Sequence, residues 1–115
     1  MDILNYSQLM NLPKYFDYSK IIKINVVSCK LKSLTELKLE RFINLQELVC
    51  SYNSLNNLDG LSNCKSLRVL YCYYNQLSNL DCLSNCKSLQ VLYCYHNQLT
   101  NLNGLSNCTS LQELN

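Results

Sequence analysis

The sequence predicts an α/β solenoid, with a parallel β-sheet on its concave side and short helical turns or irregular segments on its convex side. Residues 70–77 recur 22 positions later as 92–99, and a weaker copy occupies 48–55. Eight positions of this 22-residue unit keep their residue type: leucine at 1, 4, 11, 14 and 17, cysteine at 6 and 20, and asparagine at 9. One unit cannot bury its own leucines, whereas stacked units can.

The residue types within a unit predict its local structure. Leu48 and Cys50, at positions 4 and 6, alternate with the period of two that is typical of a half-buried strand. Asparagine at position 9 lies where the chain turns off that strand, and its amide can satisfy backbone groups and form a ladder along successive coils. Residues 60–64 suit a short helical turn. The strands of neighbouring coils then pair in parallel, about 4.8 Å apart.

This pattern, L-x-x-L-x-C-x-x-N-x-L-x-x-L-x-G-L-x-x-C-x-x, resembles the leucine-rich repeat family in its 22-residue variety. It departs from the family in having cysteine where leucine is usual at positions 6 and 20. Such short repeats are similar to those of bacterial internalins and of a regulatory subunit of protein phosphatase 1. The richness in Asn, Tyr and Cys looks more like the repeat proteins of giant DNA viruses and AT-rich protists, so the resemblance implies a viral or protist origin.

The whole chain, 1–115, is predicted to be a single leucine-rich-repeat domain. Residues 1–20 are interpreted as a degenerate capping coil in which Tyr15, Phe16 and Tyr18 close the core. A short independent capping helix is the alternative for this stretch. The repeats that follow are 21–44, 45–66, 67–88 and 89–110, with a partial repeat at 111–115.

The C-terminal end of the stack is predicted to be a contact surface. Only five residues follow the last complete repeat, so nothing in the chain covers Leu99, Leu102 and Leu105 on that side. Unpaired strand edges recruit other chains. We therefore expect a homodimer through this open C-terminal end, unless the natural chain continues beyond Asn115.

Composition narrows the expected partners and compartment. The net charge of +2 is too small to indicate nucleic acid or a membrane surface. The sequence shows neither a signal peptide nor a transmembrane stretch, so we expect a cytoplasmic protein. Six of the eight cysteines recur in slots where leucine would serve, so we expect them to be reduced and buried.

Side chains at positions 3, 5, 7 and 8 are predicted to leave the strands on the side away from the core. In the two central coils these side chains are valine, tyrosine and one histidine, and tyrosine is enriched at binding hot spots. The alternative is that the tyrosines only stack along the ladder and favour strand structure. The candidate partner-binding residues are Tyr52, Val69, Tyr71, Tyr73, Tyr74, Val91, Tyr93, Tyr95 and His96.

These features and the family resemblance favour a protein-binding module without catalysis, cofactor or metal, whose partner is a protein or peptide. His96 has no paired acid or nucleophile in its coil, and Cys82 with Cys86 lacks the second pair that zinc sites usually need. One alternative is a thiol-based redox sensor or enzyme that uses the cysteines. Another is a substrate-receptor arm of a ubiquitin ligase, although 1–20 is too short for an F-box-like segment.

Overall fold

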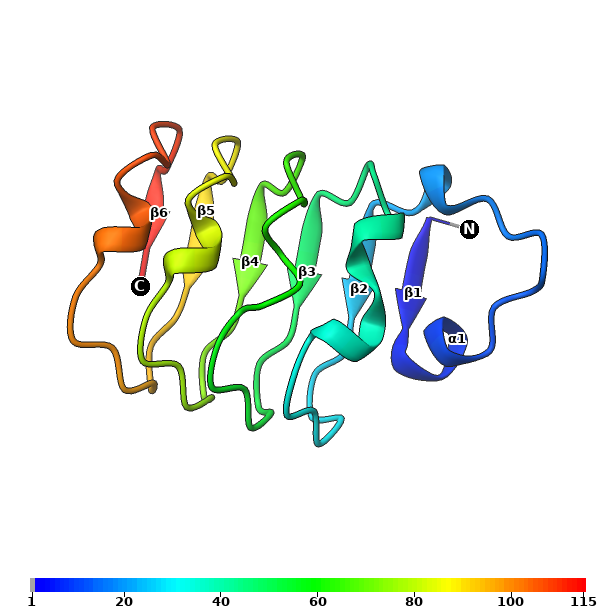
Figure 1. Cartoon of the computed structure of the whole chain (residues 1–115), viewed down its shortest axis with the longest axis horizontal. Helices are drawn as coiled ribbons and strands as arrows, with labels where there is room; N and C mark the ends of the chain where they lie inside the picture. The colour runs from blue at the N-terminus through cyan, green and yellow to red at the C-terminus, as the bar shows by residue number, and fades with distance from the viewer. Residues whose placement is uncertain (1) are drawn as a thin grey trace.

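The last four strands of the structure lie in register at intervals of 22 residues, and the first two intervals are 20 and 24 residues. In the computed structural model, which describes residues 2–115, Glu47 pairs with Val69 and Val69 pairs with Val91. All six strands belong to one parallel sheet and follow one another in chain order (Figure 1). They are β1 (Ile3–Asn5), β2 (Lys23–Asn25), β3 (Glu47–Val49), β4 (Val69–Tyr71), β5 (Val91–Tyr93) and β6 (Glu113–Leu114). The predicted solenoid with a parallel sheet is confirmed.

Short helical turns lie on the side of the coils opposite the sheet (Figure 1). Asn57, Asn79 and Asn101 each accept a hydrogen bond from the backbone N–H two residues later, at 3.0 Å. Asn79 and Asn101 precede 3-10 helices, whereas Asn57 precedes a turn without a helix. Such an asparagine side-chain bond stabilises a turn in place of a helix or strand, so the chain changes direction at these residues. The 3-10 helices are η1 (Tyr18–Lys20), η2 (Thr35–Leu37), η3 (Leu39–Arg41), η4 (Asp81–Leu83) and η5 (Asn103–Leu105).

The core is built from rows of identical residues, one from each coil. Leu48, Leu70 and Leu92 form the row behind the sheet and are fully buried. Six cysteines fill two further rows and are at most 6% exposed, as expected for small apolar side chains in leucine slots. They are Cys50, Cys72, Cys94, Cys64, Cys86 and Cys108.

An asparagine ladder holds neighbouring coils together at the end of each strand. Asn75 accepts a hydrogen bond from the N–H of Leu55 at 3.0 Å and donates to the carbonyls of Cys50 and Cys72 at 3.1 Å. Asn53 and Asn97 make the corresponding bonds in their own coils. Each amide therefore joins its coil to the preceding one through the backbone, which satisfies buried groups that would otherwise be costly.

The N-terminal segment contains a strand and a helix. Strand β1 pairs with β2, and the helix α1 (Tyr6–Met10) follows it directly. Asn5 accepts a hydrogen bond from the Gln8 N–H, and the Gln8 side chain accepts one from the Asn5 N–H, so the helix starts with a capping box. Tyr15 is 90% exposed, so its predicted part in closing the core is wrong; Phe16 and Tyr18 do pack against the core.

The C-terminal coil leaves apolar side chains uncovered. Leu102 is 48% exposed, whereas the equivalent Leu80 of the preceding coil is 1% exposed. Leu114 is 45% exposed, whereas the equivalent Leu92 is fully buried. None of the helices described in residues 2–115 is long and apolar enough to cross a membrane.

Candidate functional site

The nine predicted partner-binding residues lie together on the face of the sheet that points away from the core. We call this surface the tyrosine face: Tyr52, Val69, Tyr71, Tyr73, Tyr74, Val91, Tyr93, Tyr95 and His96. Strands β4 and β5 position Val69, Tyr71, Val91 and Tyr93, because the first and third residues of a strand point to the same side. The other five residues follow the ends of strands β3, β4 and β5.

The aromatic rings of the tyrosine face stack in columns that run from coil to coil. Tyr71 and Tyr93 stack with ring centroids 4.7 Å apart and planes 10° from parallel. Tyr73 and Tyr95 stack at the same distance and 3° from parallel. The columns follow directly from the strand register, since equivalent residues of parallel neighbours lie about 4.8 Å apart.

A third column contains three rings. Tyr74 stacks on Tyr52 at 4.7 Å on one side and on His96 at 4.1 Å on the other. Edge-to-face contacts join this column to the second, for example between Tyr52 and Tyr73 at 5.7 Å and 85°. Both faces of the Tyr74 ring are therefore covered, and a partner would meet ring edges and hydroxyl groups rather than a free ring face.

The residues of the third column have a left-handed backbone. The φ angles are 58° at Tyr52, 56° at Tyr74 and 55° at His96. Non-glycine residues adopt this conformation at a cost of about 1 kcal/mol or more. Each of three successive coils thus carries an aromatic residue at a position where glycine would adopt the left-handed backbone at lower cost. Ring stacking offsets part of that cost.

Two hydroxyl groups on this face hold their protons more tightly than usual. An interaction with the Glu113 carboxylate raises the pKa of Tyr93. Loss of hydration within the columns, followed by the neighbouring tyrosines, raises the pKa of Tyr95. Tyr93 and Tyr95 therefore act at neutral pH as uncharged hydrogen-bonding groups.

Not every residue predicted on this side is accessible. Val49 is 9% exposed and Ser51 is fully buried, although they occupy positions 5 and 7 of their coil. The Ser51 hydroxyl has no hydrogen-bond partner within residues 2–115. The accessible aromatic surface therefore begins at Tyr52 and extends toward the C-terminal coils.

The cysteines are all free and their environment suppresses the thiolate. Burial raises the pKa of the Cys50 and Cys86 thiols to about 12. Burial also raises the pKa of the half-buried Cys82 to about 11, with its hydrogen bond to Asp59 as the next cause. Reactive cysteines require the opposite shift. In the described part of the chain, no group of three or more His, Cys, Asp or Glu side chains could hold a metal ion.

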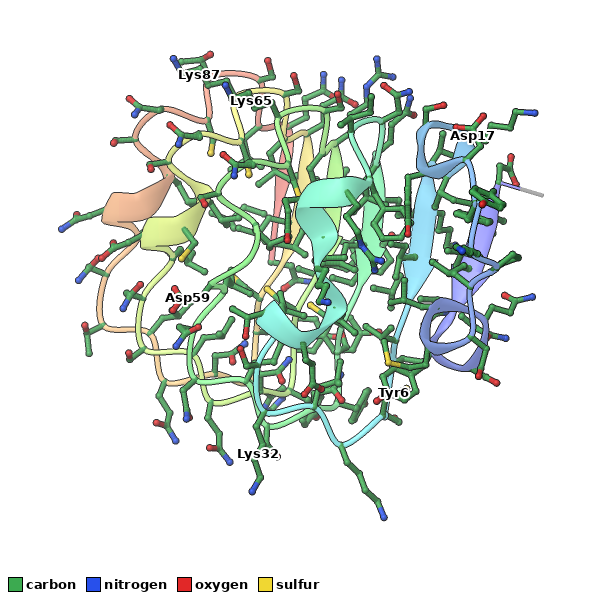
Figure 2. All side chains as sticks on the ribbon, turned by 45° about the vertical axis from the view of Figure 1, so that its right-hand side comes forward. Tyr6, Asp17, Lys32, Asp59, Lys65 and Lys87 are labelled. Carbon is green, nitrogen blue, oxygen red and sulfur yellow. The ribbon has the colours of Figure 1, made fainter. Side chains whose placement is uncertain are left out.

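Two lysines form a separate feature at the edge where the chain enters the strands. Figure 2 shows Lys65 and Lys87 next to each other on neighbouring turns. With Asn63 and Asn85 they line a polar hollow. These lysines are exposed and lie outside the tyrosine face.

Comparison with known families and structures identifies the architecture. Residues 43–85 match the family model described as leucine rich repeats, in two copies. This chain has the leucine-rich repeat fold. No curated protein sequence matches it. Leucine-rich repeat modules are typically protein-binding and usually non-enzymatic.

Solved structures show the same fold. An internalin, InlF, from Listeria monocytogenes superimposes with a TM-score of 0.64 at 15% identity, over 84% of this leucine-rich repeat chain and 35% of the internalin. Internalin C2 from the same organism gives a TM-score of 0.66 at 21% identity, over 84% of this chain and 52% of that one. The leucine-rich repeat chain thus spans about a third to a half of these structures.

Proposed function

We propose that this leucine-rich repeat chain is a protein-binding module that recognises a protein or peptide through its tyrosine face, without catalysis of its own. The observation that carries the proposal is the set of three aromatic columns on one exposed side of the sheet. Tyrosines in columns are already ordered, so binding costs little side-chain entropy. Their hydroxyl groups offer hydrogen bonds at regular intervals.

The main alternative is a thiol-based redox sensor or enzyme. A sensor needs an exposed thiol with a lowered pKa, whereas burial raises the pKa of Cys50, Cys64 and Cys86. This argues against the alternative. Free thiols persist in reducing compartments, so the eight free cysteines support a cytoplasmic location.

The remaining expectations from the sequence are also proposals. They are the 22-residue variety of repeat, a viral or protist origin, a role as a ubiquitin-ligase arm, and the absence of nucleic-acid and membrane partners. Self-association of two copies through the C-terminal coil is supported by the exposure of Leu102 and Leu114. The domain boundaries within 1–115 likewise stay predictions.

Affinity capture tests the proposed function. Wild type, the double variant Tyr71→Ala/Tyr93→Ala and the control Tyr15→Ala are immobilised and exposed to the same cell extract. The control also removes an exposed tyrosine, but from the N-terminal segment. The proposal expects a protein that wild type and the control capture equally and the double variant loses. Equal capture by all three chains would refute the tyrosine face as the binding surface.

A further inference from the structure

A groove crosses the N-terminal ends of the strands on the same side of the sheet as the tyrosine face. Its volume is about 200 Å³. It draws residues from five successive coils, from Ile3 in β1 to Gln90 immediately before β5. Four intervals of about 4.8 Å give it a length of about 19 Å, which an extended segment of about six residues would fill.

One end of the groove is apolar. Two isoleucines line this end: Ile3, the first residue of β1, is 48% exposed, and Ile22, immediately before β2, is 37% exposed. When an apolar group covers exposed aliphatic side chains, the free energy falls by about 25 cal/mol per Å² of apolar surface buried. This end therefore suits an aliphatic side chain.

The middle of the groove is electrically neutral. Lys23 Nζ and Glu47 Oε2 lie 2.9 Å apart and form the one ion pair found in residues 2–115. Since each charge satisfies the other, this part of the groove calls for no charged group from a partner.

Arg68 provides an unmatched charge at the other end. No carboxylate of residues 2–115 lies within 4.0 Å of its guanidinium group, and no hydrogen bond of its side chain is found there. The other arginine, Arg41, donates to the Tyr18 hydroxyl and the Leu37 carbonyl and packs on two aromatic rings. Arg41 is thus committed to the fold, whereas the donors of Arg68 remain available.

The repeat itself marks Arg68 as a departure. The residues at the same position of neighbouring coils are Gln46, Gln90 and Gln112. The backbone at this point is fixed: the Arg68 N–H donates to the Gln46 carbonyl at 2.7 Å, and the Arg68 carbonyl accepts from the Gln90 N–H at 2.8 Å. The guanidinium group therefore extends from a rigid base, and such a planar group matches a carboxylate in two parallel hydrogen bonds.

We propose that this groove binds an extended peptide segment that places an aliphatic side chain over Ile3 and Ile22 and a carboxylate on Arg68. The two ends are two to three coils apart, about 10–14 Å, so the two side chains belong to residues about three or four positions apart in the segment. The proposal rests on the proposed function and specifies the chemistry of its partner. The tyrosine face, which shares Val69 with the groove, would contact the rest of that partner.

Selection from a phage library of random twelve-residue peptides tests the proposal. The folded 115-residue chain is the bait, and the affinity of each selected peptide is measured by fluorescence anisotropy. We expect peptides with an aliphatic residue and an Asp or Glu at the stated spacing. Arg68→Gln should weaken them at least tenfold, and Lys87→Gln, which removes a charge outside the groove, should leave them unchanged.

A double-mutant cycle identifies the pairing of the two groups. Replacing the acidic residue of the peptide by its amide should weaken binding to wild type at least tenfold, and to Arg68→Gln by less than twofold. Selected peptides without an acid, a selection without binders, or binding unaffected by Arg68→Gln would each overturn the proposal. Peptides that need Tyr71 and Tyr93 but not Arg68 would overturn it while leaving the proposed function intact.

Discussion

Tyr73 and Tyr95 stack with their ring centroids 4.7 Å apart and their planes 3° from parallel. The pair links two neighbouring coils on the outside of the sheet, whereas the leucine rows link them on the inside. Tyr95 is nevertheless 37% exposed, so the stack is a surface feature rather than a second core. The two layers should therefore contribute differently to stability and to binding.

Removing a stacked tyrosine should destabilise the chain only modestly. Aromatic pairs contribute about 0.5–1.5 kcal/mol beyond their buried area, so Tyr95→Ala should lower the unfolding free energy by about 1–2 kcal/mol. Leu70→Ala, in the fully buried row, should cost about 2–5 kcal/mol. Urea denaturation measures both. A loss for Tyr95→Ala as large as that for Leu70→Ala would mean that the tyrosine columns are primarily structural.

An asparagine of the ladder should contribute more to stability than an asparagine that bonds an exposed turn. Asn75→Ala leaves the buried Leu55 N–H without its acceptor, at about 1–3 kcal/mol, and removes the Asn75 bonds to the Cys50 and Cys72 carbonyls, at about 1 kcal/mol each. The two carbonyls keep their bonds from Asn53 and Asn97, so we expect a total loss of about 3 kcal/mol or more. Asn79→Ala removes a single bond to an exposed turn, and a loss of about 1 kcal/mol is expected. Thermal unfolding of the two variants gives the comparison. Equal losses would show that the ladder contributes no more to stability than a bond in an exposed turn.

The buried thiols should make the fold sensitive to alkali. Burial raises the pKa of Cys50 and Cys86 from 9.0 to about 12, so the folded chain holds these protons more tightly than the unfolded chain. The resulting stability is present below about pH 9 and is lost as the pH rises from 9 toward 12. Unfolding free energies from pH 7 to 11 should fall, and less steeply in Cys50→Ala/Cys86→Ala. The same slope in both chains would contradict the assignment.

Alkylation of the native protein provides an independent test of the thiols. The two half-buried cysteines, Cys29 and Cys82, should react slowly with iodoacetamide at pH 8, and the six in the core rows only upon unfolding. Mass spectrometry of the alkylated protein counts the modified sites. A single thiol that reacts rapidly below pH 7 would instead favour the redox-sensor alternative.

The exposed C-terminal coil predicts self-association of the 115-residue chain. Two copies that meet through Leu102 and Leu114 would cover side chains that neighbouring coils otherwise bury. Sedimentation should show a shift from monomer to dimer with increasing concentration, and Leu102→Lys should weaken it. A monomer at every concentration up to the high micromolar range would exclude this contact.

The fold could be predicted from the sequence because the same residue types recur 22 positions apart, and each recurring position occupies the same place in its coil. The spacing of Leu48, Leu70 and Leu92 is enough to assign them to one buried row, and they form it. The N-terminal helix was harder to predict, since the sequence of residues 6–12 is similar to that of residues 52–58 in a later coil. Its signal was the capping pair Asn5 and Gln8.

The position of the tyrosine face on the sheet was predictable from the repeat, but the arrangement of its rings was not. The repeat places Tyr71, Tyr73 and their counterparts on one side of the sheet, yet the stacking of rings depends on rotamers that no periodicity specifies. The burial of Ser51 also depends on neighbouring coils rather than on its own position. The groove beside Arg68 was missed, because its signal is a single departure from glutamine in an otherwise regular row.

The most direct test of the central claim is the affinity of a captured partner for Tyr73→Ala/Tyr95→Ala, measured by isothermal titration beside wild type and Tyr15→Ala. Truncating a central hot-spot tyrosine costs about 2 kcal/mol, so the double variant should bind at least thirtyfold more weakly while remaining folded by circular dichroism. Tyr15→Ala should bind like wild type. An unchanged affinity in the folded double variant would show that binding does not use the tyrosine face.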